Sequence, residues 1–97
     1  MKSRFEIGRL YITAGIAQTM QEEPEFAAFA KHSFARYLAC DWGEMDASDK
    51  WQNDQAVEQS NNRIFAFYLH PTRPEWKIWI ITEAGRSATT LLFPREY

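Results

Sequence analysis

The sequence RIFAFYLHPTRPEWKIWIITEAGRSATTLLF, residues 63–93, decides the fold class of this chain. Three runs at residues 63–70, 75–82 and 88–93 are rich in aromatic and β-branched side chains, and turns that contain Pro or Gly separate them. Strand-forming runs with such short connections predict an antiparallel meander. We therefore expect the C-terminal part of the chain to form a three-stranded antiparallel sheet.

The residues before this block predict helices and one further strand. Residues 9–13 (RLYIT) suit a short strand, which we expect at an edge of the sheet or beside the last strand. A first helical segment is expected around residues 16–21. Residues 25–43 carry an apolar stripe of helical period, which predicts a long helix that ends near Gly43. The stripe consists of Phe26, Phe29, Ala30, Phe34, Tyr37 and Leu38.

A third, more polar helix is expected over residues 50–59, because capping residues precede it. In this helix we expect Trp51 to face inward, together with Gln55 or Val57. A short N-terminal strand, two to three helices and a final meander packed on the long helix describe an α+β fold. We expect residues 1–97 to form a single domain, since no linker or repeat is present.

The composition limits the classes of function. The chain has 97 residues, of which 45% are hydrophobic and 15% are aromatic, so a core forms without a metal or a disulfide. Its net charge of −2 argues against direct binding of nucleic acid. A single cysteine and the absence of a signal-like or membrane-spanning run indicate a cytoplasmic protein. We expect no cofactor and no membrane partner.

The charge is unevenly distributed. Residues 41–58 contain six acidic residues and one base, Lys50. Such a segment can steer a basic partner, and it is also typical of an ordinary solvated surface. Asp41 is expected to cap a helix or to pair with Arg63. The candidate acidic residues for binding a partner are Asp41, Glu44, Asp46, Asp49, Asp54 and Glu58.

The turn between the last two predicted strands is the second candidate site. Its polar residues could bind a phosphate or carboxylate or act as an acid–base pair. The alternative is a hairpin in which Gly85 makes the turn, the hydroxyl groups bond the backbone and an acid pairs with Arg86. The candidate binding residues here are Glu83, Arg86, Ser87 and Thr89, with Thr90 beside them.

The remaining candidate residues are the cysteine and histidines, as catalytic or metal-binding groups, and the tryptophans, as contact residues. Cys40 and His32 lie two helical turns apart, and His70 is distant in sequence, so neither a nucleophile–base pair nor a zinc site is indicated. Trp76 and Trp79 point to opposite faces of the predicted sheet. One of them is expected to be partly exposed as a protein contact; the alternative is that a second helix covers its face.

Three stretches together carry a resemblance: DWG at residues 41–43, Asn53-Asp54 followed by Arg63, and IITEAGRSATTLLFPREY at residues 80–97. They resemble a family of small bacterial proteins described as plasmid-related, which conjugative plasmids, integrative elements and phages encode. The resemblance covers nearly the whole chain, and the C-terminal block is its most specific part.

The chain departs from that family at two positions. Cys40 stands where the family has Gly before Asp-Trp-Gly, and Gly85 stands where an acidic residue is common. The resemblance implies a mobile genetic element as the context and no settled activity.

Three hypotheses follow from the sequence and the resemblance. In the first, the protein is a non-enzymatic inhibitor of the anti-CRISPR or anti-restriction kind, which binds a host nuclease or effector complex, with the acidic segment occupying a basic channel. In the second, it is a small enzyme or ligand-binding domain that uses Glu83, Arg86 and Ser87. In the third, it is a homodimer joined through the open sheet edge or an exposed Trp face.

Overall fold

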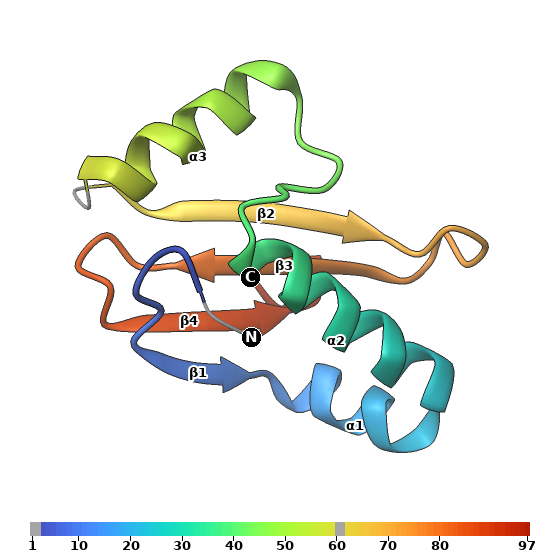
Figure 1. Cartoon of the computed structure of the whole chain (residues 1–97). Helices are drawn as coiled ribbons and strands as arrows, with labels where there is room; N and C mark the ends of the chain where they lie inside the picture. Colours follow the sequence, from blue (N-terminus) through green and yellow to red (C-terminus); the bar gives the residue numbers. More distant parts are fainter. Residues whose placement is uncertain (1–2, 60–61) are drawn as a thin grey trace.

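The structure is a computed structural model that describes residues 3–59 and 62–97. In this part of the chain the sheet has four strands. Strands β2 (Ile64–Leu69), β3 (Lys77–Thr82) and β4 (Ala88–Leu92) form the antiparallel meander. Strand β1 (Arg9–Ile12) pairs with β4 in parallel, so the strand order is β1-β4-β3-β2 (Figure 1).

This topology confirms the α+β class and corrects the predicted sheet. The sheet is mixed and four-stranded rather than antiparallel and three-stranded, because β1 lies beside the last strand and at an edge. A parallel pair needs a long crossover between its strands. Here the crossover includes all the helices and the first two strands of the meander, so no local sequence signal records the pairing of β1 with β4.

Three α-helices occur within the described residues: α1 (Ala14–Glu22), α2 (Pro24–Leu38) and α3 (Ala47–Gln59). The Thr13 hydroxyl caps α1 by accepting a hydrogen bond from the Ile16 amide at 3.3 Å. Helix α2 packs on β3 and α1 on β4, both on one face of the sheet, whereas α3 lies beside β2 (Figure 1). Along the described ranges, no helix combines the length and the apolar composition that a bilayer crossing requires.

The core fills the space between α2 and one face of the sheet. The alternating burial of β2 places Ile64, Ala66 and Tyr68 in this core, opposite the apolar stripe of α2. The predicted stripe is confirmed: Phe26, Phe29, Ala30, Tyr37 and Leu38 are buried, and Phe34 packs against the core at its margin.

The C-terminal 3₁₀ turn η1 (Pro94–Glu96) fastens the end of the chain to the start of α1. The Glu96 carboxylate accepts hydrogen bonds from the Thr13 hydroxyl at 2.6 Å, the Gly15 amide at 3.1 Å and the Phe93 amide at 2.9 Å. A carboxylate at a helix N-terminus is favourable because the first amide groups of the helix lack partners within it. The Glu96 side chain therefore stabilises the fold.

Helix α2 ends before Gly43, at Leu38, in a left-handed turn. The Asp41 amide donates to the Arg36 carbonyl at 2.9 Å and the Cys40 amide donates to the Tyr37 carbonyl at 3.0 Å, the hydrogen bonds of a Schellman motif. Cys40 occupies the left-handed position of this motif with a φ of 63°. Glycine is the residue that adopts this conformation without strain.

We expect Cys40→Gly to raise the free energy of unfolding by about 1 kcal/mol, because it removes the steric cost of a left-handed β-carbon. The gain is net of a small loss, since the Cys40 side chain packs at the margin of the core. Urea denaturation measures the change. Cys40→Ala is the matched control, because it removes the sulfur but keeps the β-carbon, and it should not stabilise; equal stabilisation by both variants would contradict the explanation.

The outer edge of β2 is covered by side chains and by the loop after α2. The Asn53 amide donates to the Phe65 carbonyl at 2.8 Å and accepts from the Phe65 amide at 3.4 Å, as a neighbouring strand would. The Glu44 amide donates to the Phe67 carbonyl at 3.2 Å, and the Glu44 carboxylate accepts from the Leu69 amide at 3.1 Å. Four of the peptide groups that β2 turns outward thus have partners: both of Phe65, the Phe67 carbonyl and the Leu69 amide.

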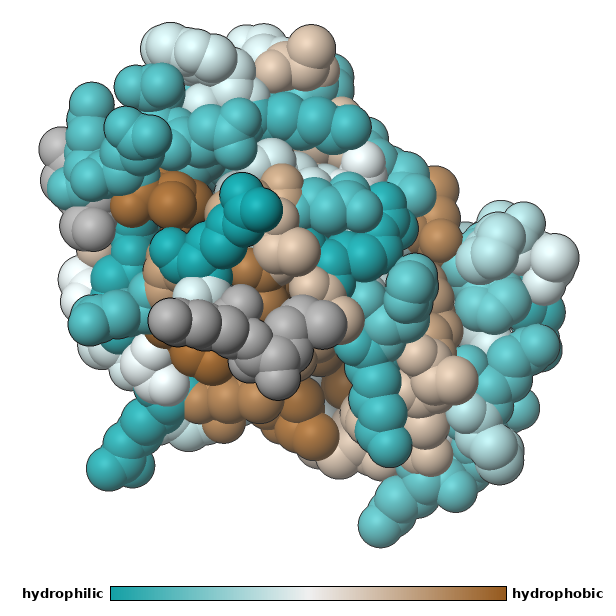
Figure 2. Space-filling model, viewed as in Figure 1, coloured by the Kyte–Doolittle hydropathy of each residue, from teal (hydrophilic) through white to brown (hydrophobic). Residues whose placement is uncertain are grey.

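At the opposite edge of the sheet, no strand of residues 3–59 or 62–97 pairs with the outer side of β1. Leu10, Tyr11 and Ile12 are 48%, 50% and 45% exposed, so the strand presents apolar side chains on both of its faces. Figure 2 shows apolar atoms in brown along the lower margin of the molecule, where β1 runs in Figure 1. The two edges of this sheet therefore differ in their protection.

Candidate functional site

The polar residues of the β3–β4 hairpin lie largely in the interior. Thr82 and Thr89 are 0% exposed, and their hydroxyl groups are 2.7 Å apart. Thr89 donates to the Ile7 carbonyl at 2.8 Å, so Thr82 donates to Thr89, and the Tyr37 hydroxyl bonds Thr82 at 2.8 Å. This hydroxyl chain joins α2, β3 and β4 to the N-terminal segment. Burial raises the pKa of Tyr37, although the hydrogen bond to Thr82 opposes the shift, so Tyr37 remains a hydrogen-bond donor.

Arg86 lies at the centre of the turn and is buried, with 8% of the residue exposed. Its guanidinium donates to four backbone carbonyls. The strongest contacts are Nη2 to Ala56 at 2.5 Å and Nη1 to Asn62 at 2.8 Å, which tie the hairpin to the end of α3 and to the segment before β2. Because the guanidinium is buried and both of its Nη atoms bond carbonyls of the chain itself, it is poorly placed to bind the phosphate or carboxylate of a ligand.

Two details of the expected hairpin are corrected. Arg86, not Gly85, adopts the left-handed conformation of the turn, with a φ of 61°. The Arg86 guanidinium bonds the Glu83 carbonyl at 3.2 Å rather than the Glu83 carboxylate. Of the candidate binding residues, Arg86 and Thr89 are interior, whereas Glu83 and Ser87 are exposed. Contact with a partner through Glu83 and Ser87 stays a prediction.

The cysteine and histidine residues do not assemble a reactive site. Burial raises the pKa of the Cys40 thiol, with the positive charge of Arg4 opposing it, so the thiolate form is disfavoured. In the His70 ring, Nδ1 accepts hydrogen bonds from the Thr72 and Arg73 amides at 3.2 Å and 3.1 Å. Over residues 3–59 and 62–97, no group of three or more His, Cys, Asp or Glu side chains is arranged to hold a metal ion.

Most of the six acidic candidates are engaged in the fold. Asp41 pairs with Arg36 at 2.7 Å, rather than with Arg63, and the hydrogen bond from Arg36 lowers the pKa of Asp41. Asp46 caps α3 by accepting from the Asp49 amide at 2.9 Å. Asp54 accepts from the buried Trp42 indole at 2.9 Å, and Glu44 covers β2. Asp49 and Glu58, both exposed on α3, make no side-chain hydrogen bond to the described residues.

The second face of the sheet has a row of aromatic rings. Trp79 is half-buried on this face, whereas Trp76 is 7% exposed in the core. The ring centroid of Trp79 lies 5.1 Å from that of Phe65 and 5.5 Å from that of Tyr97. Phe67 follows Phe65 at 6.4 Å, so the rings continue along β2. In the described chain, α1 and α2 both pack on the other face.

Cations border both ends of this aromatic row. The Lys77 amino group lies 4.4 Å from the centroid of the Phe67 ring. At the other end, Arg63 Nη1 donates to the Tyr97 hydroxyl at 3.1 Å. The Arg63 guanidinium also lies 6.0 Å from the centroid of the Tyr97 ring. A cation–π contact that solvent reaches is worth about 0.5–1 kcal/mol.

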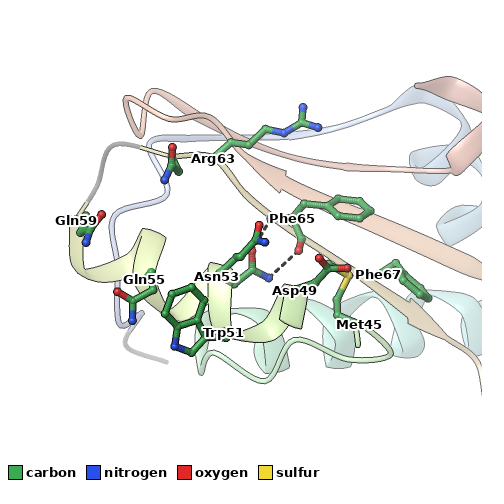
Figure 3. A pocket seen from close by; sticks show the side chains of 11 residues that line it. Met45, Asp49, Trp51, Asn53, Gln55, Gln59, Arg63, Phe65 and Phe67 are labelled. Carbon is green, nitrogen blue, oxygen red and sulfur yellow. Dashed lines mark hydrogen bonds between the residues drawn. The ribbon is translucent and has the colours of Figure 1, made fainter. Parts of the chain in front are cut away.

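A groove of about 750 Å³ runs between α3 and this face of the sheet. Its floor is formed by Phe65 and Phe67, and its wall by Trp51 and the glutamine side chains of α3 (Figure 3). Trp51 is 62% exposed, so the expectation that it faces inward is wrong. The groove is lined by Met45, Asp49, Trp51, Gln52, Asn53, Gln55, Gln59, Asn62, Arg63, Phe65 and Phe67.

No family model, curated protein or solved structure matched this chain. The resemblance to plasmid-related proteins therefore remains an expectation from the sequence. The site has to be argued from its own geometry.

The residues of the groove were largely missed from the sequence. The alternation of Phe65 and Phe67 with the buried Ile64, Ala66 and Tyr68 does place two aromatic rings on the second face of the sheet. Only the fold shows that no α1 or α2 residue covers that face. The exposure of Trp51 has a weaker signal: α3 lacks an apolar stripe, and its buried residues are Asn53 and Ala56.

Proposed function

We propose that this protein binds a segment of another protein in the groove between α3 and β2. The observation that carries the proposal is the exposed Trp51 beside an aromatic floor. Tryptophan dominates the energy of many protein interfaces, because a large ring buries much area at a small entropic cost. A helix that contributes little to the core and exposes a Trp is better explained by a contact than by folding.

The groove suits an extended peptide with apolar and basic side chains. Gln52, Gln55 and Gln59 offer both donors and acceptors to a peptide backbone. Phe65 and Phe67 offer apolar area for its side chains. Asp49 in the lining and Glu58 elsewhere on α3 favour a basic ligand, whereas Arg63 is the one base among the lining residues and can pair with an acidic group of the peptide. We assign a binding role to this groove and no catalytic role.

The resemblance supplies the class of target that we propose. Small proteins of mobile elements that counter host defence bind CRISPR effector complexes or restriction enzymes. These complexes have basic channels, which an acidic α3 and its groove would complement. We propose that this chain inhibits such a complex by occupying a basic surface of it.

Trp51→Ala tests the groove. Purified protein is titrated against a panel of purified CRISPR effector and type I restriction complexes, with both binding and DNA cleavage measured. Loss of a central Trp is expected to weaken binding by about 2 kcal/mol, roughly thirtyfold. His32→Ala is the matched control, because His32 is an exposed ring-bearing residue on α2, which packs on the other face of the sheet.

Asp49→Lys/Glu58→Lys tests the acidic surface separately. These two acids are preferable to Asp46 and Asp54, which cap α3 and hold Trp42 and whose loss would weaken the fold itself. Failure of every complex in the panel to bind would reject the defence target. Binding that Trp51→Ala leaves unchanged would reject the groove.

A further inference from the structure

The open edge of the sheet is a surface that the proposed function does not use. Natural proteins usually protect edge strands with charged residues, Pro, bulges or a covering segment. In this chain, Asn53 and Glu44 cover the β2 edge, whereas β1 carries Leu10, Tyr11 and Ile12 in succession. The contrast within one sheet indicates that β1 is kept open for pairing.

The hydrogen bonds of β1 show which of its peptide groups are available. The Arg9 amide donates to the Ser87 carbonyl at 3.0 Å, and the Thr13 amide donates to the Leu91 carbonyl at 3.1 Å. Alternate residues of a strand turn their peptide groups to the same side, so residues 9, 11 and 13 face β4. The peptide groups of Leu10 and Ile12 therefore point outward, where the described chain supplies no neighbouring strand.

We propose that β1 pairs antiparallel with β1 of a second copy of this chain. A twofold axis through Tyr11 sets Leu10 opposite Ile12 of the second copy, and Ile12 opposite Leu10. Both are hydrogen-bonded pairs, so the outward amide and carbonyl groups of all four residues are satisfied. The dimer then contains one continuous sheet with β1 of each copy at its centre.

The side chains of β1 are complementary to themselves in this register. Leu10 and Ile12 of the two copies meet as apolar pairs on one face of the sheet. Tyr11 meets Tyr11 of the second copy on the other face, in a non-hydrogen-bonded pair where side chains approach most closely. Such self-complementarity is what a twofold interface requires, and it favours a second copy over an unrelated strand.

The charges on the strand permit the same register. Arg9 falls opposite Thr13 of the second copy, so the two Arg9 residues are separated by four residues, roughly 14 Å along the strands. This exceeds the Debye length of about 8 Å at physiological salt, so their repulsion is largely screened. A single short strand buries less than the roughly 800 Å² per partner of stable complexes, so we expect a concentration-dependent dimer.

Ile12→Pro tests the proposal by sedimentation velocity over a wide range of protein concentration. Proline removes the outward Ile12 amide and leaves the amides of residues 9, 11 and 13, which bond β4, intact. The wild-type chain should shift from monomer to dimer, the Pro variant should remain monomeric, and Ile12→Val should behave as wild type. A wild-type chain that stays monomeric, or a dimer that Ile12→Pro does not weaken, would overturn the proposal.

Cysteine cross-linking tests the register and does not depend on the tolerance of proline. In a Cys40→Ala background, Tyr11→Cys places two thiols in a directly opposed pair, whereas Leu10→Cys places them diagonally, about 7–8 Å apart. The first distance is close to that of a disulfide and the second exceeds it. Mild oxidation should therefore link Tyr11→Cys and not Leu10→Cys. Linkage of both variants at equal rates, or of neither, would reject the register. Either outcome leaves the groove at α3 unaffected.

Discussion

Arg86→Met is expected to lower the free energy of unfolding by about 4 kcal/mol, because it removes four hydrogen bonds of a buried guanidinium, one of them to the carbonyl of the buried Ala56. The carbonyls belong to Ala56, Asn62, Glu83 and Ala84, so the loss is felt by α3, by the segment before β2 and by the hairpin. For a domain of this size the melting temperature should fall by roughly 15–30 °C. Thermal unfolding followed by circular dichroism measures the effect.

Two further variants at the same surface separate the causes. Arg86→Lys keeps the charge and one donor group, and we expect it to recover only part of the loss because an ammonium cannot reach four carbonyls in a plane. Arg63→Met removes an exposed arginine that contacts Tyr97, and it should cost no more than about 1 kcal/mol. A change of similar size for Arg86→Met and Arg63→Met would show that the carbonyl contacts are not the source of the stability.

The role of Arg86 in stability helps to explain why the C-terminal sequence block contains polar residues. The hairpin residues were open to two interpretations, a contact surface or a turn that serves folding. Thr82, Thr89 and Arg86 are interior and hydrogen-bonded, so for these residues the folding role is sufficient. A polar pattern in a hairpin cannot distinguish the two, because two of the four carbonyls that Arg86 bonds belong to residues 24 and 30 positions away.

The elements of this fold could be predicted where the signal is local. The stripe from Phe26 to Leu38 predicts α2, and the aromatic and β-branched runs predict β2, β3 and β4. The end of α2 was misplaced at Gly43, because a left-handed Cys40 has no sequence signal and the side chain usually found there is Gly. The pairing of β1 with β4 depends on contacts between the two ends of the chain, which no window of sequence contains.

The groove was less predictable than the core. Phe65 and Phe67 could be assigned to the second face of the sheet, but the sequence does not show whether α3 covers them. Instead α3 lies along the β2 edge, where Asn53 bonds the Phe65 backbone. The bonds from Arg86 to the Ala56 carbonyl and from Trp42 to Asp54 also hold the helix there. The groove and the exposure of Trp51 both follow from this position of α3. An Asn in a polar helix gives no sequence signal that it will bond the edge of a strand.

Gly43→Ala is expected to lower the free energy of unfolding by about 3 kcal/mol, the sum of a left-handed β-carbon and overpacking. Gly43 has a φ of 69°, and a β-carbon there would lie 2.4 Å from the Phe67 carbonyl oxygen and 2.7 Å from the Tyr68 ring. Neither neighbour can move easily, because Gly43 forms a bridge with Phe67 and Tyr68 is 0% exposed.

Gly85→Ala is the matched control, because the same methyl group would meet no atom within 4 Å and the backbone there is not left-handed. It should leave stability unchanged or raise it by up to about 1 kcal/mol. The two variants should also differ in where the fold loosens. Gly43→Ala displaces the Glu44 contacts that cover the β2 edge, so amide exchange at Leu69 should accelerate more than exchange in β4. Uniform acceleration of amide exchange across the sheet would mean that the loop at Gly43 protects the whole fold and not this edge. Equal destabilisation by Gly43→Ala and Gly85→Ala would contradict the steric argument.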